Sequence, residues 1–138
     1  MCLQIRRKTQ RNEMKRKYLE KNKPNAKGYI VGYKTFKTYG DRLISFYRGD
    51  NVYKGLFESD RHSKTLTHEE QISREISYGC HFFLTPEDAK TDIDSSPMTS
   101  SETNYVIRKI YFKPEDLVAV GRFNIWCDSG VVMQYRLY

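Results

Sequence analysis

The feature that most constrains the fold is a series of short segments, from Tyr29 to the end of the chain, in which apolar side chains alternate with polar ones. Alternation with a period of two is typical of half-buried β-strands. The links between these segments are short and carry turn residues, as in Lys113-Pro114-Glu115-Asp116. Strands joined by short links pair antiparallel, because parallel strands need a longer crossover. The sequence therefore predicts an α+β fold with a mostly antiparallel β-sheet.

Eight segments follow the strand pattern, and most of them contain β-branched and aromatic residues. They are residues 29–36, 43–47, 52–57, 80–84, 105–112, 117–120, 123–127 and 131–137. Arg48-Gly49-Asp50-Asn51 has the composition of a turn, so the second and third segments are predicted to flank it as neighbouring strands. Asp128-Ser129-Gly130 is predicted as the turn before the last strand.

Helices are predicted at three places. Residues 9–22 contain no Gly or Pro and no β-branched residue after the first position, which favours a helix. Thr85-Pro86-Glu87-Asp88 predicts a helix start, because Thr caps backbone N–H groups, Pro fits the first turn and acids stabilise the positive end of the helix dipole. Thr67 is predicted to cap a short helix over residues 68–76. Residues 94–103 are rich in Ser, Thr and acids and are predicted as a loop.

The positive charge of the chain is concentrated at its N-terminus. Residues 1–23 hold nine Lys or Arg and two Glu, a surplus of seven positive charges that equals the net charge of the whole chain, +7. Clustered cations predict an anionic partner at this arm. The apolar stripe of the helix, Met14, Tyr18 and Leu19, suits docking on the protein's own body. The alternative is an arm that packs against a second chain and lines an anionic ligand site, and the charge surplus leads us to expect that arrangement.

Length and cysteine usage bound the class of protein. The 138 residues predict a single domain, with residues 1–23 as a basic helical arm and residues 28–138 as a β-rich body. Cys2, Cys80 and Cys127 are odd in number and form no CxxC pair, which predicts reduced thiols. The chain contains neither an apolar run long enough to span a membrane nor the apolar stretch of a secretory signal. We therefore expect a cytoplasmic protein with no membrane partner.

Catalytic and nucleotide-binding fingerprints are missing from the sequence. It contains no GxxxxGK[ST], GxGxxG, HExxH or GxSxG pattern. His62, His68 and His81 lack metal-ligand spacing, so no metal site is predicted. Cys80 and His81 are neighbours in a predicted strand and point to opposite faces, which argues against a Cys–His nucleophile and makes Cys80 a small buried hydrophobe. We expect no enzyme activity and no cofactor.

Arg108 is a candidate anion-binding residue because of its position in a predicted strand. It shares a strand face with Val106, Ile110 and Phe112. A guanidinium on an apolar face must be paired or face a ligand, because an unpaired buried charge is costly. The residues alone leave open both a structural ion pair with an acid of the body and a phosphate ligand.

Two further candidates are aromatic and cationic. Phe82 and Phe83 are neighbours in a strand and point to opposite faces. If one face of the strand is exposed to solvent, one of the two rings is a platform for a nucleobase. If neither face is exposed, both are core residues. Arg122 follows Gly121 at a predicted turn. It is either an exposed turn residue or a bidentate phosphate ligand.

The order of these elements points to a family. A basic N-terminal helix is followed by Gly28-Tyr29-Ile30-Val31-Gly32-Tyr33-Lys34, by Tyr78-Gly79-Cys80-His81-Phe82-Phe83 before the capped helix, and by Glu115-Asp116-Leu117-Val118-Ala119-Val120-Gly121. From Gly28 onward this pattern resembles the phage-encoded Thoeris anti-defence proteins, which sequester the cyclic ADP-ribose signals made by bacterial TIR enzymes. Some members also hold cyclic oligonucleotides at a separate site.

The resemblance implies a non-catalytic sponge in the cytoplasm of an infected bacterial host. It implies a homodimer or higher homo-oligomer that holds a cyclic nucleotide near a subunit interface, with an aromatic ring on the base and arginines on the pyrophosphate. Matched by residue type, it implies Phe82 as the stacking residue, Arg108 and Arg122 as phosphate ligands and Asn104 as a polar reader of the ligand.

Two other classes of function stay open. The basic arm, eleven Tyr and seven Phe are typical of a protein that binds RNA or single-stranded DNA, although the body is neutral and lacks RNP-like aromatic spacing. Tyr47-Arg48-Gly49-Asp50 is similar to the nicotinamide-binding strand of ADP-ribosyltransferases, which would make the protein an ADP-ribose-handling enzyme. The Ser-Thr-Ser strand and the Glu-x-Glu turn of that family are missing from this sequence.

Overall fold

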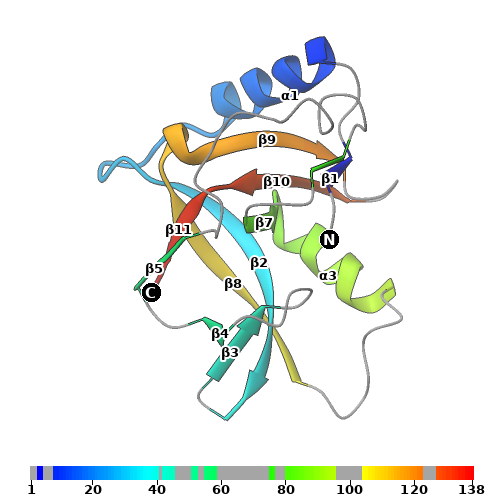
Figure 1. The fold of residues 1–138 in the computed structure, drawn as a ribbon, viewed down its shortest axis with the longest axis vertical. Helices are drawn as coiled ribbons and strands as arrows, with labels where there is room; N and C mark the ends of the chain where they lie inside the picture. The colour runs from blue at the N-terminus through cyan, green and yellow to red at the C-terminus, as the bar shows by residue number, and fades with distance from the viewer. Residues whose placement is uncertain are drawn as a thin grey trace.

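The β-strands of the protein form one antiparallel sheet (Figure 1). The computed structural model describes residues 3–4, 8–40, 42–45, 51–52, 55–58, 75–76, 80–95, 104–122 and 127–138. The main path of the sheet has the order β5-β11-β8-β2-β7-β10-β9-β1-β6, and β3 and β4 extend it beside β2. The strands are β1 Leu3–Gln4, β2 Ile30–Tyr39, β3 Arg42–Ser45, β4 Asn51–Val52, β5 Gly55–Glu58, β6 Glu75–Ile76, β7 Cys80–Phe83, β8 Asn104–Phe112, β9 Leu117–Arg122, β10 Asp128–Val132 and β11 Gln134–Leu137. With two α-helices, α1 and α3, beside this sheet, the predicted α+β class is confirmed.

The centre of the sheet is the long ladder between β2 and β8. It runs in unbroken register from Ile30 opposite Phe112 to Thr38 opposite Asn104. The next contact of β2, with β7, is limited to Tyr33 opposite Phe83. Figure 1 shows β9 and β10 running across the direction of β2 and β8, so the sheet is strongly curled. The curled sheet encloses the main core on its inner face.

The main core combines buried side chains from helix α1, Lys8–Lys21, and from strands β2, β7, β8, β9, β10 and β11. Its largest fully buried members include Tyr135, Phe36, Phe82, Phe112, Ile110, Leu117 and Leu137. Helix α1 lies along β9 (Figure 1). Its Tyr18 is 6% exposed, with its ring centroid 6.4 Å from that of Phe82, and Leu19 packs against the same core. Tyr18 and Leu19 therefore cover the protein's own core, which corrects the expectation that they pack against a second chain.

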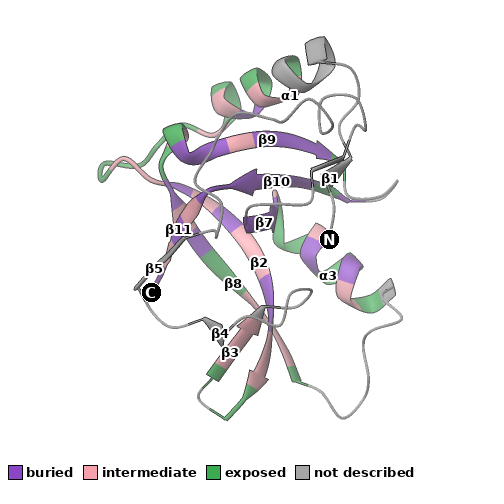
Figure 2. Cartoon of the chain, viewed as in Figure 1, coloured by how far each residue is buried: buried purple, intermediate pink, exposed green. Residues whose placement is uncertain are grey.

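Helix α3, Pro86–Ser95, covers the opposite face of the sheet. Its Ala89 packs with Phe83 and Cys127 in a second buried cluster, against which Tyr33 and Ile107 are packed. The predicted cap at the start of this helix is confirmed, since the Asp88 backbone N–H donates to Thr85 Oγ1 at 3.1 Å. Because the two clusters lie on opposite sides of β7, all four residues of that strand are buried (Figure 2).

The observed strands differ from the predicted ones near the end of the chain. Asp128-Ser129-Gly130, predicted as a turn, belongs to β10 and pairs with β7 and β9. Gly130 is needed there because a Cβ at this position would lie 2.5 Å from the Phe82 ring. The single strand predicted over residues 131–137 is two strands separated at Met133, whose backbone N–H donates to the Asp116 carbonyl oxygen at 2.9 Å. The chain leaves the β7–β9 side at Met133 and joins β8 and β5.

Some predictions fall on residues outside the described ranges. Leu43 and Ile44 of β3 pair with Val52 and Asn51 of β4, which confirms a strand pair around the predicted turn. Asn51 of that turn belongs to β4, and its other three residues lie outside the described ranges. The strand predicted over residues 52–57 is not continuous, because β5 is separate from β4 and pairs with β11. Of the helix predicted over residues 68–76, only Glu75–Ile76 is described, and it is strand β6. Of the strand predicted over residues 123–127, only Cys127 is described, and it lies just before β10 rather than within a strand. Among the described residues, neither helix is long and apolar enough to cross a membrane.

Tyr18→Phe is expected to raise the free energy of unfolding by about 1 kcal/mol, because a buried hydroxyl without a partner costs about 1–3 kcal/mol. The Tyr18 hydroxyl is buried and has no hydrogen-bond partner among the described residues. Burial also raises the pKa of this phenol in the folded protein. Above about pH 10 the Tyr18 hydroxyl of the unfolded chain ionises while that of the folded chain stays neutral, so the free energy of unfolding falls as the pH rises. Urea denaturation at neutral pH and at about pH 10.5 checks both effects. A Phe variant with no gain at either pH would contradict them.

Candidate functional site

The β2–β8 ladder places two cations directly opposite each other. Arg108 of β8 is the register partner of Lys34 of β2. Partners in an antiparallel ladder share a face, and this face continues into the core through Ile110 on one side and Phe36 on the other. Like charges directly opposite each other destabilise a sheet. An anion bound between these two side chains would relieve that repulsion.

The two cations of this pair are held differently. The half-buried Lys34 side chain reaches across the inner face, where its ammonium donates to the His81 carbonyl oxygen at 2.7 Å. Arg108 is exposed, and its guanidinium makes no hydrogen bond or ion pair with any described residue. The expected face of Arg108 is therefore right, whereas its expected burial is wrong, because the alternation of a strand gives the face and not the depth. Exposure lets this guanidinium stay charged without a protein partner.

The same face carries polar and apolar side chains further along β8. Asn104 lies opposite Thr38, whose Oγ1 donates to the Asn104 carbonyl oxygen at 3.4 Å. Thr38 is also the register partner of Leu43, and Leu43 and Val106 are partly buried against the core. Asn104 and Arg108 are four residue steps apart in β8, so their backbones are about 13 Å apart at 3.3–3.4 Å per residue. A nucleotide can span this separation.

Phe82 does not serve as a stacking residue in this structure. It is 0% exposed and packs against Phe112, with ring centroids 4.9 Å apart. A Cβ built at Gly32 or at Gly130 would lie 2.5 Å from the Phe82 ring, so two backbone segments sit against this ring. Phe83 is also buried, at 2% exposure. The interpretation of Phe82 as a ligand platform is therefore wrong, because helix α3 and the main core cover the two faces of β7.

Arg122 lies far from Arg108 in the sheet and has a protein partner. Three strands, β2, β7 and β10, separate β8 from β9 in the strand order. Arg122 lies opposite Asp128 of β10, with its Nε 3.8 Å from Asp128 Oδ1, and both side chains are more than half exposed. This is an ordinary surface ion pair. Arg122 and Arg108 therefore lie on strands that are not neighbours, and Arg122 already has an acidic partner.

Residues 13–23 of the basic arm keep most of their charged side chains exposed. Arg16 of α1 pairs with Glu13 and Glu20, the two acids of the arm. The hydrogen bond from Arg16 holds the pKa of the Glu13 carboxyl below its usual value. Lys17, Lys21 and Lys23 are exposed, and Lys17 lies 3.8 Å from Glu13. The outer side of α1 is therefore a cationic surface.

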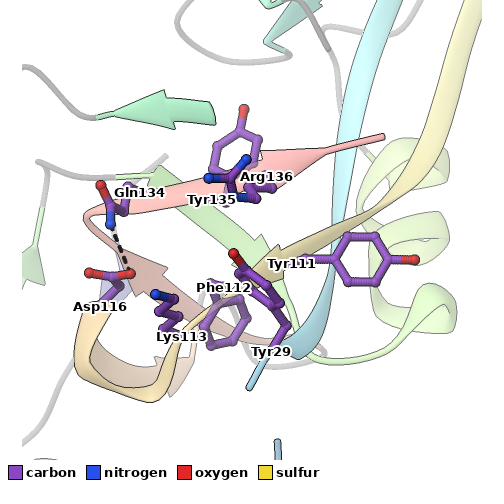
Figure 3. Close-up of a pocket in the computed structure, with 8 residues that line it drawn as sticks. All are labelled: Tyr29, Tyr111, Phe112, Lys113, Asp116, Gln134, Tyr135 and Arg136. Carbon is purple, nitrogen blue, oxygen red and sulfur yellow. Dashed lines mark hydrogen bonds between the residues drawn. The ribbon is translucent and has the colours of Figure 1, made fainter. Parts of the chain in front are cut away.

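A pocket lies on another part of the molecule, where the chain enters β2, leaves β8 and runs along β11. Its cavity volume is about 70 Å³. Its lining residues are Tyr29, Tyr111, Phe112, Lys113, Asp116, Gln134, Tyr135 and Arg136 (Figure 3). Gln134 Nε2 donates to the buried Asp116 Oδ2 at 3.1 Å, and in Figure 3 this pair lies at one end of the pocket. The pocket thus combines one carboxylate, two cations and aromatic rings.

Sequence reasoning missed Lys34 and the pocket for different reasons. Lys34 lies in a predicted strand at the same parity as Ile30 and Phe36, so the alternation alone places it on the apolar face. Its partnership with Arg108 depends on the register of β2 against β8, which has no local signal. The pocket residues come from three separate chain segments and have no common spacing. Within the described residues, no group of three His, Cys, Asp or Glu side chains is placed to hold a metal ion.

Comparisons of the chain with protein-family models, with curated proteins and with solved structures gave no match.

Proposed function

We propose that this protein captures a cyclic nucleotide without converting it, and that the β2–β8 face holds the phosphate. The observation that carries the proposal is the exposed Arg108 guanidinium, which has no partner among the described residues and lies opposite Lys34. Two cations on one face fit a phosphate or pyrophosphate, which Arg can bind in a bidentate manner. Val106 and Leu43 supply apolar surface beside them for the organic part of the ligand.

The ligand class follows from the family resemblance and from this chemistry together. A cyclic ADP-ribose signal of the kind made by TIR enzymes carries two phosphates, and a cyclic oligonucleotide is the second candidate ligand. Asn104 lies about 13 Å from Arg108 along the backbone of β8, within the reach of such a ligand. Its amide is the polar reader in this proposal, whereas Phe82 and Arg122 have no part in it. The resemblance also implies a homo-oligomer in the host cytoplasm, and light scattering of the intact chain tests the assembly.

Arg108→Ala is expected to weaken binding of cyclic ADP-ribose by about 10- to 100-fold, because a hydrogen bond to a charged group contributes about 1.5–3 kcal/mol. Lys109→Ala is the matched control, since Lys109 is also an exposed cation of β8 but points to the opposite face. Calorimetry on both folded variants compares their affinities. Equal losses in the two variants would mean that Arg108 acts only through the general charge of the protein.

The non-catalytic part of the proposal has its own test. Protein incubated with cyclic ADP-ribose is denatured, and the released ligand is analysed by mass spectrometry. Sequestration predicts that the ligand is recovered intact at the amount bound. Recovery of ADP-ribose or nicotinamide products would favour an ADP-ribose-handling enzyme instead.

Nucleic-acid binding is the second candidate function, and the cationic outer side of α1 favours it. Exposed cations such as Lys17, Lys21 and Lys23 bind phosphate backbones mainly through counterion release. Such binding weakens steeply with salt, and Arg108→Ala would leave it nearly unchanged. Titration with single-stranded RNA and DNA at low and moderate salt separates it from nucleotide capture.

A further inference from the structure

The pocket between β8 and β11 offers an anion two cations from different chain segments. Lys113 follows β8 and is exposed, and Arg136 of β11 is half-buried and lies opposite Tyr111. Neither side chain makes a hydrogen bond or ion pair with a described residue. Their guanidinium and ammonium groups are therefore available to a phosphate group.

The other end of the pocket offers a hydrogen-bond acceptor. Asp116 is 7% exposed, and its carboxylate accepts the bond from Gln134. A carboxylate has about four lone-pair positions, so it can also accept a bond from a ligand hydroxyl. Tyr29 lines the same pocket and provides apolar ring surface for the carbon skeleton of a ligand, whereas the Tyr111 ring points away from the other lining residues (Figure 3). A ligand that fits this arrangement carries an anion and hydroxyl groups on a compact frame.

The cavity volume limits how much of a ligand the pocket can enclose. Its cavity volume of about 70 Å³ is more than twice the roughly 30 Å³ share of a water molecule. It is about half of the roughly 150 Å³ cavity that accommodates benzene. The cavity therefore encloses only part of a nucleobase or of a sugar phosphate, and the rest of either ligand lies outside it.

We propose that this pocket is a second binding site, separate from the β2–β8 face, and that it takes a sugar phosphate. The phosphate binds Lys113 and Arg136, and a sugar hydroxyl donates to Asp116. The site is separate because the pocket lies at the Ile30–Phe112 end of the β2–β8 ladder, and neither Arg108 nor Lys34 lines it. The inference does not depend on the proposed capture of a cyclic nucleotide.

Ribose 5-phosphate is the probe, with inorganic phosphate and ribose as comparison ligands, and binding is followed by calorimetry on the intact chain. Ribose 5-phosphate is expected to bind at least 10-fold more tightly than either comparison ligand. Arg136→Gln and Lys113→Gln are each expected to weaken it by about 10-fold. Lys109→Gln removes the same charge from an exposed position of β8 and is expected to leave the affinity unchanged.

The outcomes separate this site from the proposed function. Arg108→Ala is expected to keep ribose 5-phosphate binding even if it loses the cyclic nucleotide. Equal affinity for inorganic phosphate would overturn the sugar phosphate as the ligand class. Equal weakening by Lys109→Gln and Arg136→Gln, with both variants folded by circular dichroism, would overturn the pocket as the site.

Discussion

Phe82→Ala is expected to lower the free energy of unfolding by about 3–5 kcal/mol, the usual cost of removing a buried Phe side chain. Phe82 is 0% exposed, and its ring contacts the main core through Phe112 and Tyr18. The variant loses these contacts and leaves a cavity in the middle of the curled sheet. Urea denaturation followed by circular dichroism measures the change.

Gly130→Ala provides a second, coupled measurement at the same place. In the wild-type background the new Cβ would lie 2.5 Å from the Phe82 ring, an overpacking expected to cost about 1–3 kcal/mol. In the Phe82→Ala background the ring is absent, and the added methyl group fills part of the cavity. The two substitutions are therefore expected to be non-additive, with the double variant more stable than the sum of the single losses predicts. If Phe82→Ala left stability unchanged and abolished ligand binding, the stacking role would be restored and the core role refuted.

Phe82 shows that strand alternation predicts the direction of a side chain but not its burial. Alternation correctly predicts β7 and the opposite directions of Phe82 and Phe83. It assumes one wet face, but α3 covers the Phe83 side and the main core covers the Phe82 side. Which elements cover a strand depends on long-range packing, and no local pattern records it. Gly32 was the available signal, since a strand glycine often marks a close approach, whereas Gly130 fell in a predicted turn.

Local chemistry predicted the elements better than their partnerships. The Thr85 cap and the strand pair formed by β3 and β4 depend on residues close in sequence, and both are confirmed. The opposition of Arg108 and Lys34 depends on two strands far apart in the chain. The ion pair of Arg122 with Asp128 depends on the extension of β10 through a segment with turn composition. Site residues that require strand order and register therefore need the structure.

Deletion of residues 1–23 is expected to destabilise the protein by about 3 kcal/mol, because it removes one buried and one partly buried large side chain, and full burial of such a side chain contributes about 1.5–3 kcal/mol. Tyr18 is 6% exposed within the main core, and Leu19 packs against that core. The deletion also removes β1, which pairs with β6 and β9. A domain of this size has about 5–15 kcal/mol of stability in total, so the loss is a large fraction of it. Thermal denaturation of the truncated and intact chains measures the change.

A second variant separates the effect of the arm's charge from the effect of its packing. It combines three substitutions, Lys17→Gln, Lys21→Gln and Lys23→Gln. These three side chains are exposed, and the substitutions leave Tyr18 and Leu19 in place. The variant is therefore expected to keep the wild-type melting temperature but to bind an anionic nucleotide more slowly at low salt, because cations around a site raise the association rate of anions. The difference from wild type is expected to shrink as salt shortens the screening length. If the truncated chain were as stable as the intact one, α1 would be only a solvated cationic tail. If the triple variant kept the wild-type association rate at low salt, the charge of α1 would have no part in ligand capture.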